Sequence, residues 1–121
     1  DVAKMMQLFL QKGNYGNKRY FSEQTFDAFN TSYYAAEGVQ RGLGFDKRIG
    51  KDGPTCGCVS EFSFGHTGFT GDIAWVDPET EIVYIFLSNR TYPEVTAEGN
   101  KLSKETIRED IQQIIQDAII K

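Results

Sequence analysis

The residues best suited to chemistry lie in one short stretch, residues 63–71, which reads Ser-Phe-Gly-His-Thr-Gly-Phe-Thr-Gly. This stretch contains His66, the only histidine of the chain, followed by small residues that alternate with aromatic ones. Glycines in a strand leave room for another molecule to lie against the backbone, and a histidine beside such an opening is a titratable hydrogen-bonding group. The stretch is therefore a candidate wall of a binding or catalytic site. The alternative is a glycine-rich bend with a histidine that only packs.

The composition is that of one folded domain. The chain has 121 residues, of which 40% are apolar and 13% aromatic, and its net charge is −4, which suits a single domain with a substantial core. Basic residues are not clustered, which argues against a nucleic-acid surface, and no apolar run approaches the roughly 18 residues that a membrane helix needs. Because the chain begins at Asp1 and shows no signal peptide, we expect a piece of a longer protein whose targeting segment lies elsewhere.

Two cysteines lie one residue apart, at Cys56 and Cys58. A disulfide across one residue is strained, since disulfides require Cα separations of about 4.4–6.8 Å and strict dihedral angles. A metal site would need more ligands than two thiolates and a distant histidine. We therefore expect two free thiols in a loop, with no metal and no cofactor.

Helical patterns lie at both ends of the chain. Residues 1–12 carry apolar side chains at helical spacing, and Gly13 is a plausible stop. A second, short helix is expected to begin after the N-cap Ser22 and to end near residues 29–30. The long final helix is expected to begin at Ser103. Its apolar stripe consists of Ile107, Ile111, Ile114, Ile115 and Ala118.

Four strands are predicted between these helices, over residues 40–48, 60–67, 72–76 and 82–88. Asp77 and Pro78 suit the first two positions of a type I turn, so the last two strands should form an antiparallel hairpin. Residues 82–87 are apolar at every position, so both faces of this strand should be covered. The final helix can cover only one face, and other side chains must cover the second.

These elements define the fold class and the domain organisation. We expect an α/β protein of the α+β type, with two N-terminal helices and an antiparallel sheet of about four strands packed by a long C-terminal helix. Residues 1–121 should form a single domain, with a helical segment over residues 1–38 and the sheet with its final helix over residues 39–121.

The motifs occur in a recognisable order. Asp-Val-Ala-Lys-Met-Met opens the chain, Ser-Glu-Gln-Thr begins at residue 22, and Gly-Leu-Gly-Phe occupies residues 42–45. Gly-His-Thr-Gly-Phe-Thr-Gly, Trp-Val-Asp-Pro-Glu and Leu-Ser-Asn-Arg begin at residues 65, 75 and 87, before an amphipathic last helix. This ordered set resembles the C-terminal part of serine β-lactamase-like proteins of the class C and penicillin-binding-protein type. The resemblance covers essentially the whole chain and implies a partial β-lactamase/transpeptidase-like fold.

The resemblance also implies which residues line a site. In that family a Ser-x-x-Lys pair supplies nucleophile and base, a Tyr-x-Asn motif supplies a second base, and a Lys-Thr-Gly or His-Thr-Gly strand forms the far wall. Only the third motif matches, at His66, Thr67 and Gly68. The first two side chains would hold a substrate carboxylate and bias the proton relay, and Gly68 would let the acyl group approach. The backbone N–H of Phe69 would donate to the oxyanion hole.

The other two motifs are missing from the chain. No serine is followed three residues later by lysine, and Tyr15-Gly16-Asn17 matches Tyr-x-Asn only as letters; we expect it to be a turn, because Gly and Asn are turn formers. The nucleophile should therefore lie in an N-terminal part of the same domain, and the isolated chain should be inactive. An ordinary histidine, with a pKa of about 6.5, is largely neutral at pH 7 whereas lysine is not. His66 thus favours a peptidase- or esterase-like member, or one that has lost its activity, over a true β-lactamase.

Two functions remain open at this point. The chain could supply one wall of a serine hydrolase that acts on a β-lactam, a D-Ala-D-Ala peptide or an ester through an acyl-enzyme, in a periplasmic or exported parent. It could instead be a non-catalytic binding or packing module of a larger exported protein. Its first partner in either case would be the missing N-terminal part of the same domain. We also expect the isolated chain to self-associate, as a homodimer, because its sheet lacks neighbours at one edge.

Overall fold

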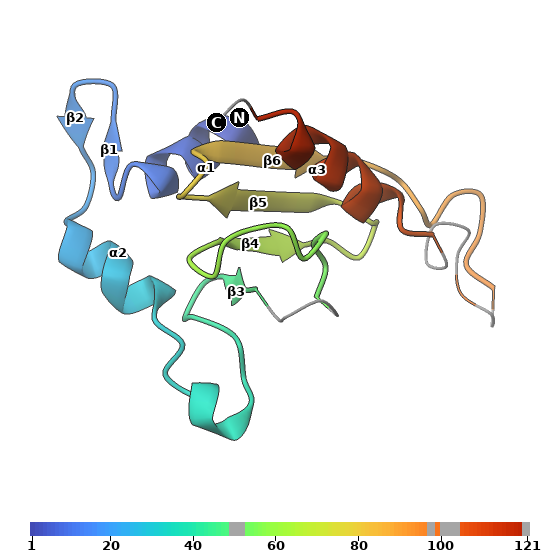
Figure 1. The fold of residues 1–121 in the computed structure, drawn as a ribbon, viewed down its shortest axis with the longest axis horizontal. Coiled ribbons are helices and arrows are strands. Elements are labelled where there is room, and N and C mark those ends of the chain that lie inside the picture. Colours follow the sequence, from blue (N-terminus) through green and yellow to red (C-terminus); the bar gives the residue numbers. More distant parts are fainter. Residues whose placement is uncertain (49–52, 97–98, 100–104, 120–121) are drawn as a thin grey trace.

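The structure is a computed structural model that describes residues 1–48, 53–96, 99 and 105–119 (Figure 1). Its main sheet has four antiparallel strands in chain order: β3 (Asp46–Lys47), β4 (Phe64–Thr67), β5 (Ile73–Asp77) and β6 (Ile82–Phe86). The α-helices are α1 (Val2–Leu10), α2 (Glu23–Asn30) and α3 (Ile107–Asp117). A small hairpin of β1 (Asn14–Tyr15) and β2 (Lys18–Arg19) and a 3-10 helix, η1 (Ala35–Glu37), complete the described elements. The expected α+β class is confirmed.

Side chains of the sheet alternate between two faces, and each face has its own apolar cluster. The first cluster consists of Met6, Phe26, Phe64 and Val76. The second cluster consists of Val59, Ile73, Trp75 and Tyr84. Helices α1 and α2 contribute to the first cluster, and Ile111 of α3 packs against the second. Figure 1 shows α1 behind the sheet and α3 in front of it, so the second covering layer that the apolar β6 required is supplied by the N-terminal helices.

Helix α1 ends before Gly13, but the left-handed residue after its C-cap Gln11 is Lys12, with φ of +47°, and Gly13 follows one position later. The N–H of Gly13 donates to the carbonyl of Leu8 at 2.9 Å, with φ of +97°, a conformation that glycine adopts at low cost. Gly16, with φ of +60°, lies at the turn between β1 and β2. The Tyr-Gly-Asn triplet is therefore a hairpin turn. The side chain of Ser22 accepts a hydrogen bond from the N–H of Thr25 at 3.1 Å, which confirms the predicted cap of α2.

The predicted strand over residues 40–48 is wrong as a single element. Arg41 pairs with Asp46 across a tight turn that is closed by a hydrogen bond of 2.8 Å from the N–H of Gly42 to the carbonyl of Phe45. A Cβ on Gly42 would lie 2.4 Å from the carbonyl oxygen of Phe29, so this glycine lets the turn pack against the end of α2. Only residues 46–47 remain as strand β3.

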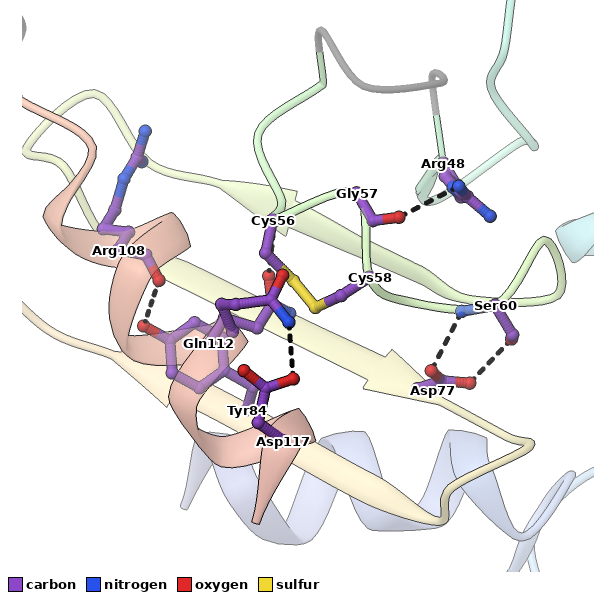
Figure 2. The surroundings of a disulfide bond; sticks show 11 residues. Arg48, Cys56, Gly57, Cys58, Ser60, Asp77, Tyr84, Arg108, Gln112 and Asp117 are labelled. Atoms are coloured by element: carbon purple, nitrogen blue, oxygen red, sulfur yellow. Dashed lines mark hydrogen bonds between the residues drawn. A yellow bond between two sulfur atoms is a disulfide. The ribbon is translucent and has the colours of Figure 1, made fainter. Parts of the chain in front are cut away.

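The expectation of free thiols is also wrong, because Cys56 and Cys58 form a disulfide (Figure 2). Their Cα atoms lie 5.2 Å apart, within the range that a disulfide allows. The residue between them, Gly57, has φ of +70°, and a glycine at this position turns the chain sharply enough to bring the two Cα atoms to that distance. The disulfide packs against the second apolar cluster.

Helix α3 does not present its predicted stripe to the sheet. Ile111 packs inward, but Ile114 is 67% exposed while Gln112 is only 3% exposed. The side chain of Gln112 accepts a hydrogen bond of 3.1 Å from the N–H of Cys56, and the hydroxyl of Tyr84 donates to a carbonyl of α3 at 2.9 Å (Figure 2). These polar bonds set the rotation of α3. The predicted start at Ser103 lies outside the described residues.

Candidate functional site

The predicted site residues lie together at one end of the main sheet. His66 and Thr67 end strand β4, where they pair with Ala74 and Ile73 of β5. Gly68 and Phe69 follow them in the turn that leads into β5. The side chain of His66 is exposed, and that of Phe69 is 77% exposed. The four predicted residues therefore form one accessible surface.

The turn after β4 holds its backbone in a fixed shape. The N–H of Gly68 donates to the carbonyl of Asp72 at 2.8 Å, and the N–H of Gly71 donates to the carbonyl of Gly68 at 3.0 Å. Gly71 has φ of +95°, and an added Cβ there would lie 2.6 Å from the side-chain oxygen of Ser88. In the described part of the chain, the hydrogen bonds of this turn leave the N–H of Phe69 without an acceptor, so it can donate to another molecule.

Asp72 anchors this turn to the segment after β6. Its carboxylate accepts hydrogen bonds from the N–H of Ser88 at 2.6 Å and from the hydroxyl of Thr70 at 2.7 Å. The side chain of Arg90 donates to the carbonyl of Phe69 at 2.8 Å. The bond from Ser88, followed by that from Thr70, lowers the pKa of Asp72 below its ordinary 3.8 because both donors favour the ionised form. Asp72 is therefore ionised at neutral pH, and its carboxylate holds the turn after β4 against the segment after β6.

The histidine has two polar neighbours. Its Nδ1 lies 2.7 Å from the backbone oxygen of Thr67, and its Nε2 lies 3.0 Å from a guanidinium nitrogen of Arg41. The same guanidinium lies 3.1 Å from the carboxylate of Asp46. The site therefore contains an ion pair from the hairpin before β4 as well as the motif itself.

Sequence reasoning missed Asp72, Ser88, Arg90 and Arg41 as members of the site. The Leu-Ser-Asn-Arg stretch was a signal for two of them, because polar residues directly after a buried strand lie at the same sheet end as the turn. For Arg41 the sequence holds no local signal, since its partner His66 is 25 residues away.

Other features of the described residues lie apart from this motif. An apolar cavity of about 400 Å³ lies between α1, α2 and the turn before β3, and its lining includes Phe9, Phe29 and Phe45. None of the four predicted site residues lines it. No group of three or more His, Cys, Asp or Glu side chains in the described ranges is placed to hold a metal ion. No helix among the same residues is long and apolar enough to cross a membrane.

Comparison with known proteins assigns the family. Residues 1–106 match the Beta-lactamase family. Proteins named "Putative D-alanyl-D-alanine carboxypeptidase" from Escherichia coli O157:H7 and Escherichia coli strain K12 are 35% and 34% identical to this chain over 99 residues. A protein of the same name from Salmonella enteritidis PT4 is 33% identical. Each match covers 78% of this chain and 22% of the relative, so the chain spans about a fifth of the length of these proteins. Because the family match extends over most of its residues, the chain belongs to the Beta-lactamase family.

Proposed function

We propose that this chain forms the C-terminal wall of the active site in a serine hydrolase that cleaves a D-Ala-D-Ala peptide, a β-lactam or an ester. Family membership and the name of the similar proteins support a hydrolase of this type. The observation that carries the proposal is the backbone N–H of Phe69, held in a rigid turn beside His66 and Thr67 and without an acceptor among the described residues.

The N–H of Phe69 suits an oxyanion hole. Acyl transfer passes through a tetrahedral intermediate whose oxyanion is stabilised by preorganised N–H donors. The carbonyl of Phe69 accepts a hydrogen bond from Arg90 at 2.8 Å, and the N–H groups of Gly68 and Gly71 are also hydrogen-bonded within the turn. The N–H of Phe69 therefore needs little reorientation when negative charge develops on the substrate oxygen. The substrate carbonyl would lie against the end of β4, with the hydroxyl of Thr67 in reach of its polar groups.

Gly68 supports the presence of a bound molecule at this position. A Cβ on Gly68 would lie no closer than 3.4 Å to its nearest neighbour, the side chain of Asp72, and 3.8 Å from the hydroxyl oxygen of Thr70, both ordinary contact distances. A Cβ on Gly65 would instead lie 2.3 Å from the carbonyl of Ala74. Internal packing therefore requires glycine at position 65 but not at position 68. An approaching acyl group explains the second glycine, because it needs the strand surface to be bare.

The nucleophile and its base would come from outside this chain. No serine here is followed three residues later by lysine, and the chain spans 22% of its relatives. The first partner of this chain is then the N-terminal part of the same domain. The disulfide between Cys56 and Cys58 supports a periplasmic or exported parent, because disulfides persist in oxidising compartments.

The full-length protein that carries this segment provides the test. We expect His66→Ala to slow acylation by a labelled penicillin or by a D-Ala-D-Ala peptide roughly 10- to 100-fold, since the variant loses the hydrogen bond that holds the charged guanidinium of Arg41 at the site, and such a bond contributes about 1.5–3 kcal/mol. Gly68→Ala should slow acylation as well, while the matched Gly44→Ala, with no atom within 4 Å of its added Cβ, should not. Both glycine variants should keep the thermal midpoint.

Two results would contradict the proposal. An unchanged acylation rate in His66→Ala with a large drop in the thermal midpoint would make this histidine structural. Failure of the full-length protein to form an acyl-enzyme with penicillins, D-Ala-D-Ala peptides or esters would favour a non-catalytic module.

A further inference from the structure

Arg41 is held beside the motif by its own backbone as well as by its side chain. It pairs with Asp46 in an isolated bridge, and the N–H of Lys47 donates to the carbonyl of Gln40 at 3.0 Å, so the hairpin before β4 is closed on both sides of Arg41. The guanidinium contacts Asp46 at 3.1 Å and His66 at 3.0 Å. The arginine side chain nevertheless remains 50% exposed.

The two contacts of the imidazole admit one form of the ring. A guanidinium only donates hydrogen bonds and stays protonated in proteins, so Nε2 of His66 must accept from Arg41. The backbone oxygen of Thr67 only accepts, so Nδ1, at 2.7 Å from it, must carry the hydrogen. A doubly protonated ring would direct its Nε2 hydrogen against the cation. The geometry therefore requires the Nδ1–H tautomer of His66.

We propose that Arg41 is a positioning residue of this site, which holds His66 in the Nδ1–H tautomer and places a permanent positive charge beside the His66-Thr67-Gly68 wall. This cation comes from the preceding hairpin, and the motif residue is a neutral link between the guanidinium and the strand. Arginine has five N–H donors, and its contacts with Asp46 and His66 leave donors at the exposed side for an anionic group of a substrate.

The tautomer can be measured directly because the chain has one histidine. The 121-residue chain, labelled with ¹⁵N in histidine only, gives a single pair of ring nitrogens in a two-bond proton–nitrogen spectrum. At a pH where titration of the same sample shows a neutral ring, we expect Nδ1 to be protonated and Nε2 bare. Arg41→Met should shift the ring towards the Nε2–H form that dominates in free histidine. Arg41→Lys, which keeps a donor, should preserve the Nδ1–H form.

Controls separate this effect from a change of fold. Arg19→Met removes an exposed arginine of strand β2 and should leave the tautomer unchanged, and the fluorescence of the buried Trp75 reports whether each variant is folded. An Nε2–H ring in the unsubstituted chain, or an unchanged Nδ1–H ring in Arg41→Met, would overturn the proposal. Should Arg41→Met not fold, the unsubstituted chain and Arg41→Lys still decide it.

The second part of the proposal rests on the proposed function and is tested in the full-length protein. Arg41→Met should raise the KM for a peptide substrate with a free carboxylate about 10-fold or more, with a smaller effect on kcat and on the matched methyl ester, and Arg41→Lys should restore part of it. Equal losses for both substrates would overturn the charge role. If the full-length protein forms no acyl-enzyme at all, the proposed function fails, whereas the tautomer measured in the chain still decides the positioning role.

Discussion

The carboxylate of Asp72 accepts a hydrogen bond of 2.6 Å from the backbone N–H of Ser88. This bond joins the turn after β4 to the segment after β6, so the shape of the candidate oxyanion turn depends on one side chain. The hydroxyl of Thr70 adds a second bond at 2.7 Å. The pair of bonds lowers the pKa of Asp72, and the acid stability of the chain should reflect this.

Asp72→Ala should lower the free energy of unfolding by about 1–3 kcal/mol at pH 7, because hydrogen bonds to charged groups contribute amounts of this order. The folded-state pKa is below the ordinary 3.8, so the contribution is complete only above about pH 5 and is lost as the pH falls through the lowered value. Urea unfolding at pH 7 and at pH 3 tests this. The difference between variant and parent chain should shrink at pH 3. Asp27→Ala, at an exposed carboxylate, should have little effect at either pH.

Gly65→Ala should destabilise the chain strongly. An added Cβ would lie 2.3 Å from the carbonyl of Ala74 and 2.5 Å from the ring of Trp75, and forcing extra atoms into a packed site costs about 1–3 kcal/mol or more. Gly44→Ala is the matched control, since nothing lies within 4 Å of its added Cβ. Thermal unfolding followed by circular dichroism compares the two variants. Similar midpoints would show that the sheet can shift at position 65 to accommodate the added methyl group.

Lys47 should make the stability rise with pH. Burial lowers its pKa from 10.5 to about 8, so the unfolded chain binds more protons than the folded one between these values and stability increases with pH across that window. Unfolding free energies measured at pH 7 and 9.5 test this prediction. Lys47→Met should remove the rise, while Lys18→Met, at an exposed lysine, should retain it. A rise of equal size in both variants would assign the effect to other groups.

The isolated chain should form no acyl-enzyme. The motivation is the absence of a Ser-x-x-Lys pair, without which the wall residues have no covalent intermediate to stabilise. Incubation with a labelled penicillin followed by gel fluorography measures this. Saturable labelling of any serine in the chain would show that the family motifs were assigned wrongly.

The isolated chain should self-associate at high concentration. Helix α3 exposes Ile114 to 67%, and α1 exposes Met5 to 49% and Val2 to 43%, and apolar surfaces of this kind tend to find partners. Light scattering across a dilution series measures the oligomer, and Ile114→Lys should weaken it. Helices α1 and α2 already cover one face of the sheet, so a strictly monomeric chain at high concentration would show that this cover suffices.

Features with a local cause were predictable from the sequence. The cap at Ser22, the end of α1 before Gly13 and the turn at Asp77 each depend on residues within a few positions. In the last case the side chain of Asp77 accepts a hydrogen bond from the N–H of Glu79 at 3.1 Å, as such turns require. The antiparallel pairing of β5 with β6 also followed from this turn signal between two apolar runs.

Features with distant causes were not predictable. The rotation of α3 about its axis depends on the hydrogen bond between Gln112 and Cys56, which are 56 residues apart. The spacing of apolar residues predicts which face of a helix is buried, but it cannot predict a buried polar side chain such as Gln112. The state of His66 likewise depends on Arg41, 25 residues earlier. The prediction of one strand beginning at residue 40 was wrong because the backbone at Gly42 packs closely against the carbonyl oxygen of Phe29. This contact forms only in the folded chain.

The order of the main sheet, in which each strand pairs with the next along the chain, has a kinetic consequence. Pairing of β4 with β5 and of β5 with β6 closes only short loops, and short loops cost little entropy and form quickly. The hairpins between β4 and β6, which carry the His66-Thr67-Gly68 wall and the turn of Phe69, are therefore expected to assemble early. The docking of α1 and α3, from opposite ends of the sequence, would be the slower event.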